Sequence, residues 1–237
     1  MDLFLKAAWQ QIIMANYEVS PALLMPYLPK GVELDTYNGK VYVSLVGFIF
    51  KNTKLFGFPI PLLGTFEEIN LRFYVLRKEN NTIKRGVVFV NETVPYKAVA
   101  WLANKLYHEN YTCVPTKHQW LITNKTKTIE YQWKINKEWQ HIKVNALNES
   151  KQMVTGSFEE FIFEHYYGYA KVDDNTTEEY EVIHQKWETQ SILSYQINCD
   201  FKKMYGNNFS FLNNETPHSV FITNGSDVSI KWKRNKL

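Results

Sequence analysis

Residues 66–76, FEEINLRFYVL, decide the fold, because apolar and polar side chains alternate along them. Successive side chains of a β-strand point to opposite faces, so this pattern predicts a strand with two unlike faces. The apolar face carries Ile69, Leu71, Phe73 and Val75, and the polar face carries Glu68, Asn70, Arg72 and Tyr74. The polar row is either an ordinary solvated outer face or the lining of a polar cavity.

The polar row has a specific chemistry if it lines a cavity. Arg72 then pairs with Glu68 or is left free for a ligand carboxylate, which its planar, two-pronged guanidinium fits well. Glu68 beside Tyr74 supplies a proton donor and acceptor if burial raises the pKa of the acid. We therefore take Glu68 as a candidate catalytic residue, and Asn70, Arg72 and Tyr74 as candidate ligand-binding residues.

Two other polar stretches add candidates. Residues 107–111, YHENY, join a predicted helix end to a predicted strand, where polar side chains often line the mouth of a site. His108 is a candidate catalytic acid or base, and Glu109 and Tyr111 are candidate ligand contacts. His108 and Glu109 are otherwise surface groups or partners of the helix end. His165 follows as a ligand contact or proton shuttle, or else as a hydrogen-bonded core histidine.

The segments around this strand predict further strands and a few short helices. Residues 79–81, ENN, are turn-prone, so residues 66–77 and 84–94 are expected to form a hairpin. Residues 40–50 are apolar on both faces, which is typical of a central strand, and Gly47 marks a bulge or a close approach. The dipeptide Asn224-Gly225 predicts a second hairpin, between residues 219–223 and 227–232.

Helix signals are few and local. Pro95 opens an amphipathic helix that runs to about residue 107. Ser157 begins a capping box, and Asp200 is placed to cap another short helix. No linker, repeat or charge block divides the sequence. We therefore predict one α+β domain, mostly β, over residues 1–237.

Composition excludes several classes of protein. The chain has 237 residues, of which 45% are hydrophobic and 16% aromatic, so a disordered chain is excluded. The net charge is +3, and acidic and basic residues are interspersed along the chain, so the sequence gives no sign of a basic surface that would bind nucleic acid or an anionic membrane. No secretory signal and no apolar stretch of membrane-spanning length are visible, so we expect a cytoplasmic protein.

Motifs for metals and common cofactors are absent from the sequence. The two cysteines, Cys113 and Cys199, have no CxxC partner, and the six histidines show no metal-ligand spacing. No GxSxG, Walker or GxGxxG motif is present. We therefore expect no metal and no cofactor.

Several stretches together resemble the YqjF-like family of uncharacterised bacterial proteins, known as domain of unknown function 2071. The resemblance runs from about Trp9 to residues 219–221. It rests on residues 16–19 (NYEV), 39–48, 66–75, 85–90 (RGVVFV) and 164–169 (EHYYGY). The family brings no established activity with it.

The fold of that family is similar to acetoacetate decarboxylase. This implies a large mixed sheet curled into a cone or partly closed barrel around an internal cavity, and relatives with this fold commonly form homo-oligomers. A glutamate on a comparable strand assists the decarboxylases, and Glu68 matches it best, with Glu67 as the fallback. This likeness favours an inward-facing polar row.

The likeness to the decarboxylases fails at their catalytic lysine. Those enzymes carry a Gly-Phe-Pro-Lys-Lys turn after a helix, and its first lysine forms a Schiff base. The corresponding residues 108–112 read HENYT and hold no lysine. Lys105 and Lys117 are the nearest lysines, and both are expected to be solvated. Schiff-base decarboxylation is therefore disfavoured.

Three hypotheses of function remain from the sequence. The first is a cofactor-free protein that binds a small organic acid or similar metabolite. The second is a lysine-independent enzyme, lyase-like or isomerase-like, that uses Glu68 or His108 as a base and Arg72 to stabilise charge. The third is an interaction scaffold, which a solvated polar row would favour.

Overall fold

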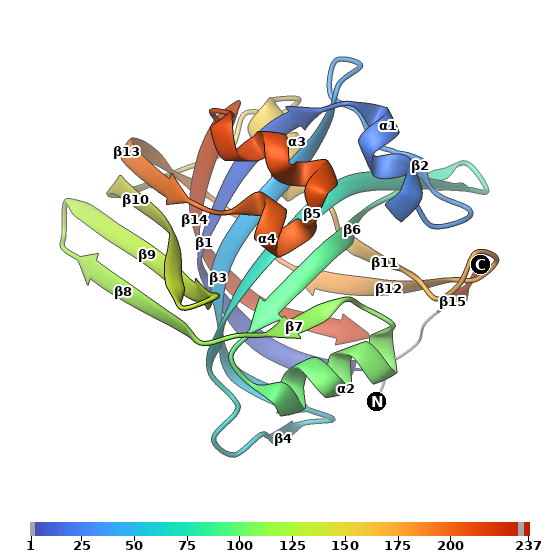
Figure 1. The fold of residues 1–237 in the computed structure, drawn as a ribbon, viewed down its shortest axis with the longest axis horizontal. Helices are drawn as coiled ribbons and strands as arrows, with labels where there is room; N and C mark the ends of the chain where they lie inside the picture. The colour runs from blue at the N-terminus through green and yellow to red at the C-terminus, as the bar shows by residue number, and fades with distance from the viewer. Residues whose placement is uncertain (1–2, 232–234) are drawn as a thin grey trace.

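The computed structural model describes residues 3–231 and 235–237, except for the side chains of residues 106 and 107. Within this part of the chain, fifteen strands form one sheet (Figure 1). The strands are β1 (Leu3–Val19), β2 (Glu33–Leu34), β3 (Val41–Leu55), β4 (Phe58–Pro59), β5 (Phe66–Glu79), β6 (Thr82–Val94), β7 (Tyr111–Cys113), β8 (Thr116–Ile122), β9 (Thr126–Ile135), β10 (Glu138–Lys151), β11 (Tyr167–Lys171), β12 (Thr177–His184), β13 (Thr189–Asn198), β14 (Ser219–Lys231) and β15 (Asn235–Lys236). The predicted α+β class with a large, curled, mixed sheet is confirmed.

The helices are short and lie around the sheet. They are α1 (Pro21–Leu24), α2 (Lys97–Tyr107), α3 (Phe158–Phe163) and α4 (Phe201–Tyr205), with 3-10 helices η1 (Met25–Tyr27) and η2 (Asn207–Asn214). The predicted N-caps are confirmed, since Ser157 accepts a hydrogen bond from the Glu160 amide and Asp200 from the Lys203 amide, but the capping box is incomplete because the Glu160 carboxylate accepts from the Gly156 amide instead of the Ser157 amide. None of the helices described is long and apolar enough to cross a membrane.

Seven strands follow one another in a ring. Their order is β12-β11-β6-β5-β3-β1-β14, and β14 pairs again with β12 through residues 228–230 and 182–184. Most neighbours are antiparallel, whereas β6 and β11 are parallel and share only two residue pairs, at Gly86 and Val87. The ring encloses an interior that one face of each strand lines.

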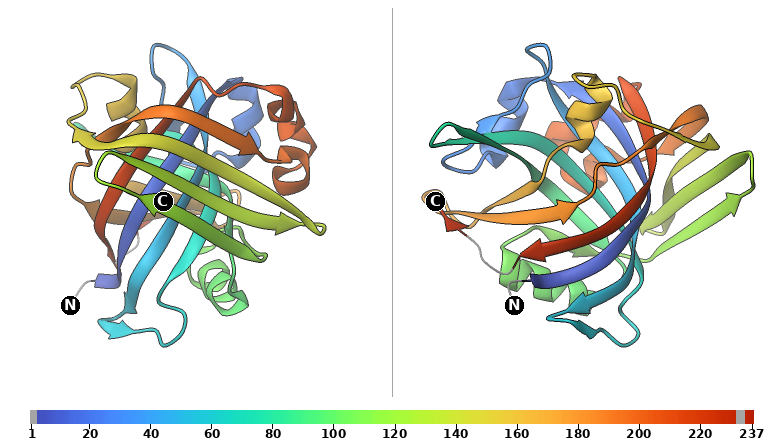
Figure 2. Two further views of the ribbon diagram at one scale, coloured as in Figure 1. Left: turned by 90° about the vertical axis from the view of Figure 1, so that its left-hand side faces the viewer. Right: turned by 180° about the vertical axis from the view of Figure 1, so that it is seen from behind.

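A second layer covers the outside of the ring. Strands β13, β10, β9 and β8 continue the sheet beyond β14, and Figure 2 shows β8 to β10 crossing over β1 and β3. A Cβ on Gly47 of β3 would lie 2.9 Å from Tyr131 of β9 and 3.2 Å from Ile142 of β10. Gly47 thus marks a close approach of the two layers, as the sequence indicated.

The predicted hairpin at Asn224-Gly225 is wrong, because residues 219–231 form one continuous strand, β14. Gly225 has the positive φ of +75° that the dipeptide suggested, but it lies opposite Gln10 within the pairing of β14 with β1. Its Cβ would meet the Trp9 carbonyl oxygen at 2.0 Å. The glycine therefore permits a close approach to the β1 backbone at a positive φ within a long strand, a conformation that a tight turn also requires.

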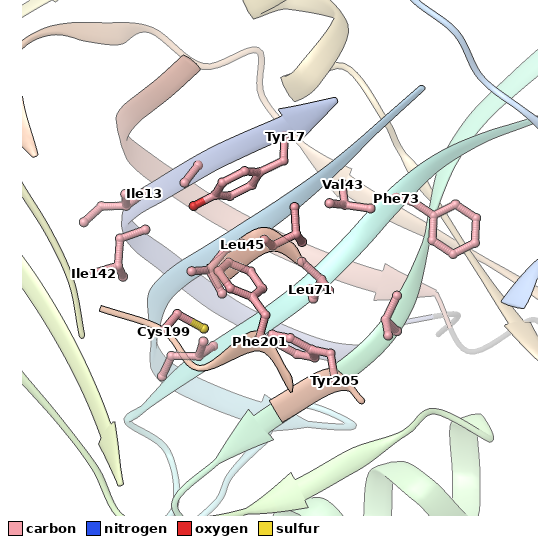
Figure 3. Close-up of a cluster of buried hydrophobic side chains, with 14 of the residues drawn as sticks. Ile13, Tyr17, Val43, Leu45, Leu71, Phe73, Ile142, Cys199, Phe201 and Tyr205 are labelled. Carbon is pink, nitrogen blue, oxygen red and sulfur yellow. The ribbon is translucent and has the colours of Figure 1, made fainter. Parts of the chain in front are cut away.

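Strand β5 separates two hydrophobic clusters. Its outward row packs with β9, β10, α4 and η2, as Figure 3 shows for Leu71, Phe73, Ile142, Phe201 and Tyr205. The inner cluster joins apolar side chains of the ring to those of α2 and α3. The hairpin of β5 and β6 forms as predicted, with Asn80 and Asn81 both at positive φ in the turn.

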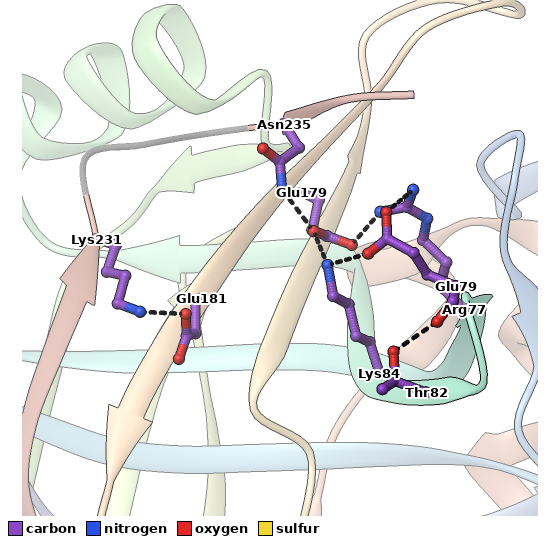
Figure 4. A network of polar contacts seen from close by, with 8 residues as sticks. All are labelled: Arg77, Glu79, Thr82, Lys84, Glu179, Glu181, Lys231 and Asn235. Carbon is purple, nitrogen blue, oxygen red and sulfur yellow. Dashed lines mark hydrogen bonds and ion pairs between the residues drawn. The ribbon is translucent and has the colours of Figure 1, made fainter.

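A polar network ties the tip of this hairpin to β12 and β15 (Figure 4). The Glu179 carboxylate of β12, 2% exposed, lies 2.9 Å from both Arg77 and Lys84 of the hairpin. Asn235 of β15 donates a further hydrogen bond to it. These contacts hold the parallel side of the ring, where the backbone pairing of β6 with β11 is shortest.

Candidate functional site

The polar row of β5 faces the interior of the ring. Asn70 lies opposite Val46 of β3 and Glu92 of β6, so these three side chains share the inner face. Glu68, Asn70 and Glu92 are each 2% exposed. The polar row is therefore not an ordinary solvated face. The scaffold hypothesis, which a solvated row would have favoured, loses that support.

Two compartments lie within the ring and share Glu68, Tyr111 and Tyr180 in their walls. The inner compartment has a volume of about 70 Å³, and its polar wall residues include Glu68, Asn70, Arg72, Glu92, His165 and His184. The outer compartment has a volume of about 110 Å³, and its apolar wall includes Phe50, Leu55, Phe66, Val99, Leu102 and Ala103. Most polar side chains of the site thus lie in the inner compartment, whose remaining wall is apolar, whereas the outer compartment is mainly apolar.

Glu68 lies where the two compartments meet. Its Oε1 accepts a hydrogen bond from Asn70 Nδ2 at 3.0 Å, and its Oε2 accepts one from Tyr111 Oη at 3.1 Å. Burial raises the pKa of Glu68 to about 7, since these hydrogen bonds and the Arg72 charge offset the loss of water only in part. An acid with this pKa can both give and take a proton near neutral pH.

Two more glutamates lie close to Glu68. Burial raises the pKa of Glu92 well above its ordinary value, and the charges of Glu109 and Glu68 raise it further. Burial also raises the pKa of Glu109 to about 8, although Tyr180 Oη donates a hydrogen bond of 2.9 Å to its carboxylate. Three carboxyl groups in one small space cannot all ionise at neutral pH.

Arg72 supplies a positive charge to the wall of the inner compartment. Its Nη2 donates to Met14 Sδ at 3.4 Å, and its guanidinium lies 5.6 Å from the centre of the Tyr74 ring. Among the residues that the structure describes, no carboxylate lies within ion-pair distance of Arg72, and its buried Nε has no hydrogen-bond partner. Of the two expectations for Arg72, pairing with Glu68 is wrong, and a guanidinium free for a ligand fits the geometry.

His165 and Tyr74 lie on the same side of the cavity but differ in access to it. His165 is part of the inner wall, where its Nε2 lies 3.2 Å from Asp35 Oδ2. Burial lowers the pKa of His165, while the hydrogen bond with Asp35 opposes that shift. Tyr74 lies behind the wall, because its hydroxyl is bonded to Ser44 and its ring packs 4.7 Å from His165. The expected proton pair of Glu68 with Tyr74 does not form, and Tyr111 takes that place.

The remaining predicted residues divide between the cavity and the surface. Glu109 and Tyr111 line the outer compartment, as expected of residues at its mouth. His108 ends α2 in a left-handed conformation, is 41% exposed in its side chain, and lies 3.2 Å from Glu178 outside both linings. The structure therefore does not bring His108 to Glu68. Lys105 packs on Trp101 and Lys117 on Trp139, also away from the cavity.

Sequence reasoning gave too little weight to two residues of the site. Glu92 belongs to the inner face because β6 has an irregularity in its pairing at Leu71 and Arg72, which shifts the alternation of its side chains. Tyr180 comes from β12, which reaches the site through the closure of the ring. The polar pair Asn91-Glu92 after the apolar run of residues 86–90 gave a signal for Glu92, but no local pattern pointed to Tyr180.

The chemistry of the site is that of acids and one guanidinium. Within residues 3–231 and 235–237, no three His, Cys, Asp or Glu side chains are placed to hold one metal ion. The described part of the chain also places no lysine in the wall of either compartment. The groups that remain can bind an anion, transfer a proton and stabilise developing negative charge.

Comparison with known sequences gives a family and one relative. The family model DUF2071, described as an uncharacterized conserved protein, matches residues 6–227. The uncharacterized protein YqjF of Bacillus subtilis strain 168 is 30% identical over 108 residues, which are 45% of this chain. That match spans 43% of the length of YqjF.

Comparison with solved structures gives the fold. Acetoacetate decarboxylase from Legionella pneumophila has a TM-score of 0.65 at 12% identity, over 99% of this chain and 87% of its own. An acetoacetate decarboxylase-like enzyme from Sphingomonas wittichii RW1 has a TM-score of 0.66 at 9% identity, covering 100% and 94%. The enduracididine biosynthesis enzyme MppR, solved with pyruvate, has a TM-score of 0.65 at 10% identity, covering 100% and 91%. At these identities the likeness is one of fold.

Proposed function

The chain belongs to the DUF2071 family of uncharacterized conserved proteins, and we propose from its cavity that it binds a small organic acid whose carboxylate lies against Arg72. The observation that carries this proposal is a guanidinium in the cavity wall that lacks an ion-pair partner among the described residues. A half-buried cation without a counter-charge is partly desolvated, and a ligand carboxylate offsets that cost. MppR, which shares the fold, has been solved with pyruvate, a small acid of this class.

The neighbouring glutamates tune this binding through protonation. A bound carboxylate adds negative charge beside Glu68 and Glu109, whose pKa values already lie at about 7 and about 8. The added charge raises both pKa values, so binding near pH 7 takes up protons. A protonated Glu68 then donates a hydrogen bond to the ligand, where an ionised one would repel it.

A ligand screen by thermal shift tests the binding proposal. We expect a small keto, hydroxy or unsaturated acid to stabilise the wild type by about 2.7 kcal/mol at a hundred times its Kd, or roughly 5–10 °C. Arg72→Gln should abolish the shift. The matched control is Arg85→Gln, which removes a guanidinium that pairs with Asp35 outside the cavity lining. A shift that persists in Arg72→Gln, or none in the wild type, contradicts the proposal.

A second candidate function is acid–base catalysis on the same ligand, and the pKa of Glu68 at about 7 favours it. In complexes where Glu68 is ionised, which become more frequent as pH rises, Glu68 would take a proton from the carbon next to the ligand's carbonyl or carboxyl group, and Arg72 would stabilise the enolate. Exchange of that proton with deuterium, followed by NMR, tests the step. Glu68→Gln should stop the exchange while binding remains, whereas equal exchange rates in both proteins leave a binding protein only.

The two cysteines support the expected location. Cys113 and Cys199 are both free thiols. Free thiols persist in a reducing compartment, so we place the binding function in the cytoplasm. Detection of the protein in a cytoplasmic fraction, with both thiols open to alkylation after unfolding, checks this assignment.

A further inference from the structure

The outer compartment has the character of an apolar pocket. It lies at the end of the ring where β1 and β5 begin and β3 ends, and α2 covers it. Phe50, Phe66, Leu55 and the α2 residues Leu102 and Ala103 supply its carbon-rich wall. Its volume of about 110 Å³ is somewhat less than the engineered apolar cavities, about 150 Å³, that take up benzene.

Five polar side chains line the outer compartment: Glu68, Tyr111 and Tyr180 are shared with the inner compartment, whereas Thr53 and Glu109 belong to the outer compartment alone. Glu68 and Tyr111 form part of both compartments, and the Tyr111 hydroxyl is already bonded to Glu68. The Glu109 carboxylate accepts a hydrogen bond from Tyr180. A molecule that extends from Arg72 past Glu68 therefore enters surroundings that are mainly apolar, although Glu109 and Thr53 also line them.

We infer that the ligand is a monocarboxylic acid with an apolar tail, and this inference rests on the binding function proposed above. The carboxylate lies against Arg72 in the inner compartment, and the tail passes Glu68 and Tyr111 to fill the outer compartment. The chemical class is a short alkyl or aryl acid. A two- or three-carbon acid would leave the outer compartment empty and gain nothing from its wall.

A chain-length series tests the inference by calorimetry. The probes are acetate, butyrate, hexanoate and octanoate, with adipate as the dicarboxylate of the same length as hexanoate. Burial of each methylene should tighten Kd about fourfold until the compartment is full. Adipate should bind at least about a hundredfold more weakly than hexanoate, because its second charge would be buried against carbon.

Variants of α2 locate the tail. Ala103 is half-buried and lines the outer compartment, so Ala103→Phe should fill it and weaken hexanoate to the affinity of acetate. Ala98→Phe is the matched control, since Ala98 lies on the same helix, is exposed and is outside the lining. It should leave the whole series unchanged. Equal stability of the two variants by urea unfolding shows that both fold.

The outcomes separate this inference from the function on which it rests. The inference that the outer compartment holds the tail (the tail site) is supported if affinity rises fourfold per methylene and Ala103→Phe removes this rise. If short acids bind and lose affinity in Arg72→Gln, but longer acids bind no tighter, the tail site is wrong and the carboxylate site stands. A chain-length effect that Ala103→Phe leaves intact also overturns the tail site. If no acid binds the wild type, both proposals fail.

Discussion

Glu179 and Glu68 are two glutamates with the same burial and opposite surroundings. Each is 2% exposed. Glu179 lies between Lys84 and Arg77, each at 2.9 Å (Figure 4). Among the residues that the structure describes, the hydrogen-bond donors to the Glu68 carboxylate are Asn70 and Tyr111, and both are neutral.

The pKa values of the two acids diverge for this reason. Burial alone raises the pKa of both. At Glu179 the hydrogen bonds from Lys84, Asn235 and Arg77 outweigh burial, so its pKa lies below the ordinary value. At Glu68 the neutral donors do not outweigh it, and the pKa rises to about 7. A buried acid that is fully compensated stabilises the fold, whereas an uncompensated acid beside a cavity is available for chemistry.

Removing Glu179 should produce the largest effect. Glu179→Ala leaves the partly buried Lys84 and Arg77 with Glu79 as their remaining carboxylate partner, so we expect a loss toward the lower end of the range for buried pairs, about 3–4 kcal/mol in the free energy of unfolding at pH 7. The lowered pKa means that its stabilisation is present above pH 4.5 and is lost as pH falls through the folded-state pKa. Urea unfolding at pH 7 and pH 4 measures both effects.

A matched control exists on the same strand. Glu181 is paired with Lys231 and its side chain is 34% exposed, so Glu181→Ala should cost less than about 1 kcal/mol. Equal losses in the free energy of unfolding for the two variants would show that burial does not make the ion pairs of Glu179 stronger than an exposed pair. A Glu179→Ala loss that does not shrink toward pH 4 would contradict the assigned pKa direction.

The effect of Glu68→Gln on the free energy of unfolding should depend on pH in the opposite sense to that of Glu179→Ala. The folded-state pKa of Glu68 is raised from 4.5 to about 7, so its contribution is full below pH 4.5 and is lost as pH rises through 7. Relative to wild type, Glu68→Gln should therefore be neutral near pH 4.5 and more stable by up to about 3 kcal/mol at pH 8. A stability difference that stays flat between these pH values would contradict the raised pKa.

Replacing Arg72 tests how far its positive charge lowers the pKa of Glu68 against the effect of burial. Arg72 lowers the pKa of Glu68 through its charge without forming an ion pair. Arg72→Gln should therefore raise the pKa of Glu68 by about one unit, equivalent to ~1.4 kcal/mol. Carbon-13 NMR of the Glu68 carboxyl group gives this pKa directly. Arg85→Gln, outside the cavity, should leave it unchanged, and the same shift in both variants would exclude a local effect of Arg72.

The sequence was sufficient for the strand that builds the site, because alternation along residues 66–76 fixes which side chains share a face. The sequence did not show that both faces of this strand are buried. The apolar row packs against the second layer, and the polar row lines the cavity. That outcome depends on β8 to β10 crossing β3, and no local pattern encodes such long-range packing.

Two other errors have the same physical origin. Asn224-Gly225 fits a close approach to a neighbouring strand as well as a turn, and only pairing with β1 decides between them. His108 and Glu109 are adjacent in sequence, yet the end of α2 turns Glu109 into the cavity and His108 toward Glu178. Local patterns predicted the elements, whereas closure of the ring determined the members of the site.

The smallest expected effect comes from Glu67, the sequence neighbour of Glu68 on the outward face. Burial acts on Glu67 too, but hydrogen bonds from His118 and Thr116, both at 2.6 Å, outweigh it and lower the pKa. Glu67→Gln should therefore cost under about 1 kcal/mol at pH 7, and the cost should shrink as pH falls below 4.5 through the folded-state pKa, the reverse of Glu68→Gln. Urea unfolding of both variants across pH 4 to 8 gives the comparison. If the stability difference from wild type changes in the same direction with pH for Glu67→Gln and Glu68→Gln, the face of β5 on which an acid lies does not determine its protonation.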